Sequence, residues 1–198
     1  MSIKFQYNRT SLQALNRQLS IRQRALPTLK NKEAALRLEV KKARDHATNC
    51  EQVLARRMAD YEQMTALWQE FDPELIQVEE VIIKTQKIAG IRVPILDEVR
   101  FETKPYSLFN RPHWFPDGVA ILEELAKVAI ERQFFLRKLE LLDYARKKTT
   151  QKVNLYEKVQ IPGYEEAVLK IKRFLEDEEN LSKAAQKIVK NRQAAARK

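Results

Sequence analysis

The chain has 198 residues, of which 44% are hydrophobic and 32% charged, with three glycines, one cysteine, two histidines and a formal net charge of +10. This composition favours helices too strongly for a sheet protein, and it excludes a disulfide framework or a histidine-cysteine metal site. No apolar run is long enough to cross a bilayer, and residues 1–12 lack a signal-peptide pattern. We therefore expect a soluble, cytoplasmic protein without a cofactor.

Residues 12–71 carry a coiled-coil pattern. Apolar residues recur at alternate steps of three and four from Leu12 to Phe71, and only Arg22, Glu33 and Arg57 interrupt the series. A helix of this length is roughly 90 Å long and begins near Asn8, where small polar residues can cap it. Such a helix needs a partner of similar length.

The residues from Asp117 onward supply that partner. Apolar residues recur at helical spacing in two runs, which are Ile121, Leu125, Val128, Phe135, Leu139, Leu142 and then Ala167, Ile171, Phe174, Leu181, Ala185, Ile188. The two helices are predicted to pair antiparallel in a register that sets position i opposite position 189 minus i. The predicted fold class is mainly α, a long antiparallel two-helix coiled-coil hairpin with a small middle insert.

The predicted organisation is one structural unit of three parts. Residues 1–72 form the N-terminal coiled-coil helix, 73–116 the middle insert, and 117–198 the C-terminal coiled-coil helix. Pro27 and Pro162 face each other in the working register, and each removes a backbone hydrogen bond. We expect a joint in the coil at their level.

The insert is expected to contain a short helix, a β-hairpin and a proline-rich loop. Asp72 and Pro73 are a helix start signal, followed by an apolar patch from Leu75 to Ile83. Residues 87–96 and 98–103 are rich in β-branched residues and predict a two-stranded hairpin that turns near Leu96 and Asp97. The loop aromatics are expected to pack on the base of the coil; they are Tyr106, Phe109, Trp114 and Phe115.

The positive charge is concentrated near the two ends of the chain. Residues 1–32 contain seven cations and no acidic residue, and residues 183–198 contain six cations and no acidic residue. An antiparallel hairpin places both segments at the same end, so this end is expected to be strongly basic.

Catalytic motifs are missing from the sequence. There is no phosphate-binding loop, because the glycines are isolated at positions 90, 118 and 163. His46 and His113 lie far apart in the predicted hairpin, and Cys50 occupies a seam position where burial is the simpler interpretation. The acidic run from Glu176 to Glu179 is interpreted as charge pairing with the basic N-terminal helix rather than as a metal site.

Three groups of residues, in order, resemble a known family. The first is Asn8-Arg9-Thr10 with Leu12 and Leu15; the second is Leu29, Lys30, Lys32 and Leu36; the third is Lys152, Val153, Asn154, Glu157, Ile161 and Pro162. Together with the hairpin-sized insert around Arg92-Val93-Pro94, they resemble the D subunit, the rotor axle of V-type and A-type ATPases, over nearly the whole chain.

The resemblance implies a non-catalytic central-stalk protein, peripheral to the membrane, that transmits torque between a catalytic hexamer of A and B subunits and an ion-translocating ring. It implies an F subunit beside the coil and a docking subunit of the membrane ring at the insert. Residues expected at the insert contact are Ile88, Arg92, Val93, Pro94, Val99 and Phe101. Residues expected to contact the hexamer are Arg9, Leu12, Leu15, Arg17, Arg22, Lys187, Ile188 and Arg192. No nucleic acid is expected, and the transported ion and the direction of operation stay open.

Two other functions fit the basic termini. A nucleic-acid-binding or scaffolding coiled coil would use the cations on phosphates, although the chain lacks a recognition helix. A membrane-surface adaptor would place residues 183–198 on acidic lipids, although the alanine-rich end offers little apolar area. Salt-sensitive retention on DNA would favour the first, and liposome flotation the second.

Overall fold

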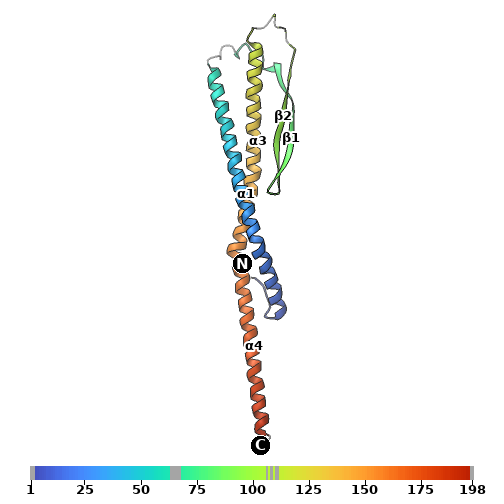
Figure 1. Ribbon diagram of the computed structural model, residues 1–198, viewed down its shortest axis with the longest axis vertical. Helices are drawn as coiled ribbons and strands as arrows, with labels where there is room; N and C mark the ends of the chain where they lie inside the picture. Colours follow the sequence, from blue (N-terminus) through green and yellow to red (C-terminus); the bar gives the residue numbers. More distant parts are fainter. Residues whose placement is uncertain (1–2, 63–67, 106, 108, 110–111, 197–198) are drawn as a thin grey trace. The chain divides into compact units, whose positions relative to one another are not determined.

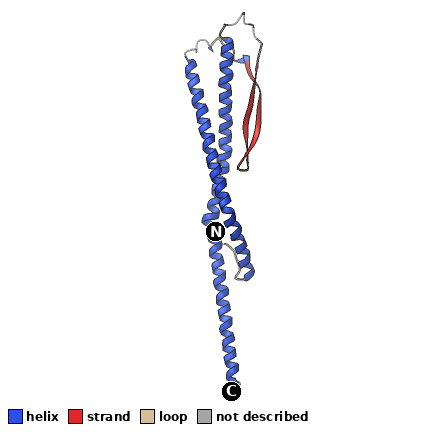
Figure 2. Ribbon diagram, viewed as in Figure 1, coloured by secondary structure: helices blue, strands red, loops and turns tan. Residues whose placement is uncertain are grey.

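The computed structural model describes residues 3–62, 68–105, 107, 109 and 112–196. The elements in chain order are α1 (Arg9–Glu62), η1 (Pro73–Leu75), β1 (Ile76–Ile88), β2 (Ile91–Thr103), α3 (Phe115–Asn154), the π-helix η3 (Leu155–Gln160) and α4 (Ile161–Ala196), as Figures 1 and 2 show. The chain divides into two compact units. Unit 1 comprises Met1–Lys32 with Thr149–Lys198, and unit 2 comprises Glu33–Lys148.

Unit 2 pairs the second part of α1 with α3. Its core contains Leu36, Val40 and Leu142, together with Val93 from the hairpin. The first two are seam positions predicted from the heptad pattern, and Ala43, Ala47 and Cys50 of the same seam are also buried. The antiparallel helical hairpin with a β insert is therefore confirmed.

A second cluster closes the end of unit 2. Phe71, Leu75 and Phe115 are buried, and Trp68 and Trp114 pack against them. The prediction that Trp114 and Phe115 pack on the base of the coil is confirmed. For Phe109 it is wrong, because that side chain is fully exposed, and Tyr106 lies outside the described residues.

The hairpin turn differs from its predicted position. Ala89 and Gly90 connect the strands, both with positive φ (48° and 84°), as a two-residue type I′ turn requires. The predicted turn at Leu96 and Asp97 is wrong, because these residues lie within β2, where Leu96 pairs with Ile83. A glycine at the second turn position removes the steric cost of the left-handed backbone there, and this matters more than a polar residue at the tip.

The short helix of the insert is only the three-residue turn η1. Asp72 caps it, since its Oδ1 accepts the N–H of Glu74 at 3.0 Å. The apolar residues after it form β1 rather than a continuing helix, because β-branched side chains favour a pleated strand. Figure 1 shows both strands running alongside α3. Val93 of the hairpin is completely buried between α1 and α3 residues.

Unit 1 pairs the first part of α1 with η3 and α4. Asn8 caps α1, because its Oδ1 accepts the N–H of Ser11 at 2.7 Å. Leu15 is buried against Ala167, Val168 and Ile171 of α4. Leu12 and Ile3 pack on this cluster from the N-terminal side.

The working register needs correction within unit 2. Arg57 pairs with Glu124 and Glu51 with Arg132, so facing positions add to 181 and 183 rather than 189. The register still describes the end of the unit, where the ring of Phe71 lies beside Gly118. Residues 69–72 are not helical, so the helical register seen at Glu51 and Arg57 does not extend to Phe71.

The aromatic cluster leaves no room for a side chain at position 118. A Cβ there would lie 2.8 Å from Cζ3 of Trp114 and 3.1 Å from Cε2 of Phe71. We predict that Gly118→Ala lowers the free energy of unfolding by about 1–3 kcal/mol, because the packed rings must shift. Thermal unfolding followed by near-ultraviolet circular dichroism measures it.

Gly163→Ala is the matched control. Its Cβ would meet only the flexible end of Ile3, at 3.3 Å, and alanine gains helix propensity. Equal or greater stability is expected there. A Gly118 variant as stable as its control would contradict the packing described for the cluster.

Candidate interaction sites

The end of α4 is a helix without a partner in the described chain. Residues 180–195 are all exposed, including Leu181 at 72%. Lys183, Lys187, Lys190 and Arg192 lie in the same stretch, and residues 183–195 include no acidic residue. A helix with an apolar stripe and only positive charge fits a surface that is apolar and acidic.

The eight predicted hexamer-contact residues fall into three settings. Leu12 and Leu15 belong to the apolar cluster of unit 1. Arg9 and Arg17 are exposed on the first turns of α1, and Lys187, Ile188 and Arg192 are exposed roughly 24 Å or more beyond Ile171 along α4. The structure therefore brings the first four near one end of α1 and leaves the last three on the helix that continues past it.

Arg22 is the eighth residue and is used within the chain. Its Nε donates to Oε1 of Gln160 at 2.7 Å, and its guanidinium lies over the ring of Tyr164, 4.5 Å from the centroid. Tyr156 approaches the same guanidinium from 5.9 Å. Arg22 interrupts the apolar seam, and these contacts provide its guanidinium with a hydrogen-bond acceptor and aromatic faces at that position.

The π-helix η3 ends two residues before Pro162, one of the two prolines of the predicted coil joint. Pro162 has no N–H to give to the carbonyl of Lys158, and its ring crowds that carbonyl. The preceding turn widens, and the N–H of Ile161 donates to the carbonyl of Tyr156, five residues back. Sequence patterns with a period of 3.6 do not reveal such a turn, although the proline was its visible signal.

Packing is loose at the same level. The structure describes every α1 residue from 16 to 35, and none of them is buried. A groove of about 610 Å³ lies there between Leu29 and Tyr156. The contacts between α1 and η3 at this level include an ion pair, in which Lys30 Nζ lies 2.6 Å from Oε1 of Glu157. Pro27 itself lies inside a continuous α1.

Five of the six predicted insert-contact residues are at least partly covered by other residues of this chain. Val93 is buried, and Ile88, Pro94, Val99 and Phe101 are half-buried. Lys127 of α3 lies 5.5 Å from the ring of Phe101. Arg92 is exposed and available to a partner.

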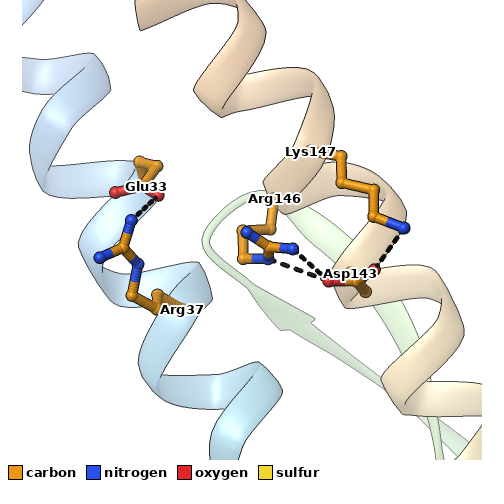
Figure 3. Close-up of polar contacts among 5 residues, drawn as sticks. All are labelled: Glu33, Arg37, Asp143, Arg146 and Lys147. Atoms are coloured by element: carbon orange, nitrogen blue, oxygen red, sulfur yellow. Dashed lines mark hydrogen bonds and ion pairs between the residues drawn. The ribbon is translucent and has the colours of Figure 1, made fainter.

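Asp143 is the centre of a polar cluster in unit 2. Nε and Nη2 of Arg146 donate to its Oδ1 at 2.9 and 2.7 Å, and Nζ of Lys147 lies 3.0 Å from Oδ2 (Figure 3). These hydrogen bonds lower the pKa of the Asp143 carboxyl below its usual value. On α1, Glu33 is only 15% exposed and accepts from Arg37 at 2.8 Å, as the same figure shows.

Cys50 and the acidic run behave as inert structural groups. Burial raises the pKa of the Cys50 thiol, and Glu131 raises it further, so the reactive thiolate is disfavoured. A hydrogen bond from Lys183 lowers the pKa of Glu179, and Arg9 contributes in the same direction. The described residues contain no cluster suited to a metal ion.

Comparison with known proteins agrees with this arrangement along nearly the whole chain. The family model for the D subunit of ATP synthase matches residues 11–191. The chain belongs to the family of ATP synthase D subunits. It is similar to the V-type ATP synthase D subunit of Borreliella burgdorferi, with 29% identity over 192 residues that cover 95% of this chain and 94% of the relative. It is also similar to the V-type ATP synthase D subunit of Chlamydia trachomatis serovar L2, with 31% identity covering 89% and 90%.

Family membership makes this chain an accessory stalk subunit of a rotary ATPase and not its catalytic subunit. Within the described residues, none of the helices contains an apolar stretch long enough to span a membrane. The candidate sites are accordingly surfaces for other proteins: the exposed end of α4, the exposed part of the insert and the open faces of the coil.

The Asp143 cluster predicts a small acid sensitivity of this ATP synthase D subunit. The folded-state pKa is depressed, so its stabilisation is complete above the unfolded value, near 3.8, and is lost as the pH falls through the lower folded value. We predict that Asp143→Asn costs less than about 1 kcal/mol at pH 7 and less at pH 2 than at pH 7. Urea unfolding of variant and parent at both pH values measures the difference.

Glu140→Gln on the preceding turn is the comparison, because it removes one negative charge and a more exposed ion pair, with Arg137. A penalty for Asp143→Asn that is the same at both pH values would contradict an ionic origin.

Proposed function

We propose that this chain is the torque-transmitting axle of its rotary ATPase, placed in the centre of a hexamer of A and B subunits. The observation that carries the proposal is the last part of α4, which continues past the start of α1 as a single exposed basic helix with an apolar stripe. A ring of subunits that encloses such a helix would cover its apolar residues from all sides.

The mechanism follows from shape and stiffness. A two-stranded coil presents different side chains at different angles, so rotation changes which hexamer interface can close on nucleotide. The axle itself does no chemistry. Exposed cations such as Arg9, Lys187 and Arg192 suit this role, because screened surface charges guide a helix without holding it at one angle.

We further propose the remaining partners and the location. The F subunit would lie beside the coil, and a docking subunit of the membrane ring would contact the insert through Arg92 and the exposed strand residues. The chain would then be cytoplasmic and peripheral to the membrane. Val93 is supported as a structural residue of the insert rather than a contact residue, because it is completely buried.

The segment around η3 is proposed as a compliant joint. Four features lower the resistance to twisting there. They are the π-helix, the proline after it, the lack of buried residues from 16 to 35 of α1, and polar pairs such as Lys30 and Glu157 that can exchange with water. This segment would twist under torque and store elastic energy, while the better packed parts turn as stiff bodies.

The axle proposal predicts a loss of coupling when four exposed cations are neutralised. Arg9→Gln, Arg17→Gln, Lys187→Gln and Arg192→Gln together are expected to lower the ATPase rate of the reconstituted complex several-fold with the helical content unchanged, because hexamer contacts are lost. The measurements are the hydrolysis rate, the copy number per hexamer and far-ultraviolet circular dichroism.

A matched control neutralises four insert cations, Lys84, Lys87, Arg100 and Lys104, with the same change in net charge. This control is expected to hydrolyse ATP at the parent rate in the soluble complex. Equal rates for both quadruple variants, or a parent chain that stays outside the hexamer, would remove the proposal.

The joint predicts a local change when Pro162 is replaced. Pro162→Ala restores an N–H for the carbonyl of Lys158, so the π turn is expected to become α-helical and amide exchange at residues 156–162 to slow by about tenfold or more. Hydrogen exchange with mass spectrometry measures it. Pro116→Ala is the control, because proline at the first turn of α3 costs little; equal effects would contradict the joint.

The basic end of α4 also suits a polyanion, which keeps nucleic-acid binding as the second candidate function. It predicts DNA retention that weakens steeply with salt and disappears in the Lys187 and Arg192 variant. The axle proposal predicts weak retention in both proteins.

A further inference from the structure

The exposed end of α4 carries a regular apolar stripe. Phe174, Leu181 and Ile188 are seven residues apart, and Ala185 is placed among them so that the steps alternate between four and three. This alternation is typical of a coiled-coil seam. Tyr7 packs on Phe174 at the start of the stripe, with ring centroids 4.9 Å apart, whereas Leu181 and Ile188 are more than half exposed. The stripe therefore has the pattern of a paired helix, although no other described part of the chain covers residues 180–195.

The charges of the same stretch form two separate blocks. Residues 176–179 are all acidic, and the cations that follow are Lys183, Lys187, Lys190 and Arg192. The four carboxylates balance the four cations, so residues 174–192 are neutral overall. Only one of these pairs forms within the described helix, because Nζ of Lys183 lies 2.8 Å from Oε1 of Glu179. The other six groups make no ion pair with a described residue.

The unpaired charges cannot reach each other within one helix. The middle of the acidic block and the middle of the unpaired cations are about 11 residues apart, which is roughly 16 Å along the axis. A second helix that runs alongside can bring a cationic block to the acidic one. The surface that this block requires is apolar, neutral overall and charged in two blocks, and α4 itself has all three properties.

The shape of the stripe also suits a copy of itself. A shallow hollow of about 450 Å³ lies over Ser182, Ala185 and Val189. Ser182 and Ala185 have small side chains, so another helix can approach closely there. Leu181 projects one turn away, roughly 40° around the helix from Ala185. A large side chain beside a hollow of this kind is the knob and hole of coiled-coil packing.

The charge pattern favours one orientation of the second copy. In a parallel pair the acidic blocks would lie against each other, and so would the basic blocks, which is unfavourable. In an antiparallel pair each acidic block lies beside the basic block of the other copy. The heptad register that sets Leu181 opposite Ala185 of the second copy also sets Phe174 opposite Arg192, and Glu178 then lies one layer from that arginine. The same register serves the apolar side chains and the charges.

We propose that the free chain forms a two-fold symmetric dimer in which residues 174–192 of two copies pair antiparallel. Leu181 of each copy fills the hollow over Ala185 of the other, and Glu178 pairs with Arg192. A self-complementary surface of this kind is what a two-fold interface requires. The proposed hexamer covers the same stripe, so the dimer belongs to the chain before assembly and opens before insertion. That last step rests on the proposed axle function, whereas dimerisation does not.

The test measures the mass of the full chain by sedimentation equilibrium, without other subunits, at about 50 and 300 mM salt. A monomer–dimer equilibrium with a Kd of about 10–100 µM is expected at the lower salt concentration, because five helical turns bury little surface. The higher salt concentration is expected to weaken it by about tenfold, because the charges are screened. Leu181→Ala is expected to weaken it by about tenfold or more at both concentrations, because the knob is lost.

Charge reversal tests the orientation and the register. Glu178→Arg and Arg192→Glu are each expected to weaken dimerisation by about tenfold or more at low salt, because like charges then meet. The chain with both substitutions is expected to recover the Kd of the parent within about threefold, because opposite charges meet again. In a parallel pair each position faces its own copy, so single reversals that leave the Kd unchanged would overturn the antiparallel register.

Leu38→Ala is the matched control for Leu181→Ala, because Leu38 of α1 is also an exposed leucine, at 54%. It is expected to dimerise like the parent, and thermal unfolding of dilute samples is expected to be the same for all variants. A parent chain that is still a monomer at about 500 µM, or a dimer that Leu181→Ala leaves intact, would overturn the proposal. Entry of the chain into the hexamer is measured in a separate reconstitution, so a failed dimer and a failed axle are distinguished.

Discussion

The constraint on which this structure depends is that α1 cannot remain folded alone. Its apolar seam is continuous apart from three polar positions, and a helix of that length draws its stability from packing. Each polar seam residue has a partner: Arg22 has Gln160 and Tyr164, Glu33 has Arg37, and Arg57 has Glu124. Gln18 on α1 also accepts hydrogen bonds from Arg22. Because Gln160, Tyr164 and Glu124 lie on the facing helices, the contacts of Arg22 and Arg57 with them favour one orientation and register, whereas a uniform apolar seam would permit several.

Packing quality varies along the chain. Tight apolar clusters occupy the level of Leu15 in unit 1 and the levels of Leu36 and Phe115 in unit 2. Around η3 the facing helices are joined mainly by hydrogen bonds and ion pairs. Removal of buried apolar contacts costs several kcal/mol, whereas exposed ion pairs contribute less than about 1 kcal/mol each. Resistance to bending is therefore expected to be lower around η3 than at the apolar clusters.

The sequence predicted what depends on periodicity. Buried α1 residues such as Leu36, Val40 and Cys50 are all seam positions, and the helix start near Asn8 was read from its cap. It failed where local geometry decides. The turn at Ala89 and Gly90 lacks a polar tip residue, the apolar patch from Leu75 to Ile83 was not recognised as part of a strand, and the π turn has no period of its own. The contact residues assigned to partners stay predictions.

The exposed end of α4, which no other described helix covers, has a consequence for assembly. About 17 residues of lone helix are marginally stable in water, because nucleation is costly and no second strand covers the apolar stripe. In the proposed hexamer, enclosure would supply the free energy that holds this segment in one conformation. Insertion would then be a folding reaction as well as a docking reaction.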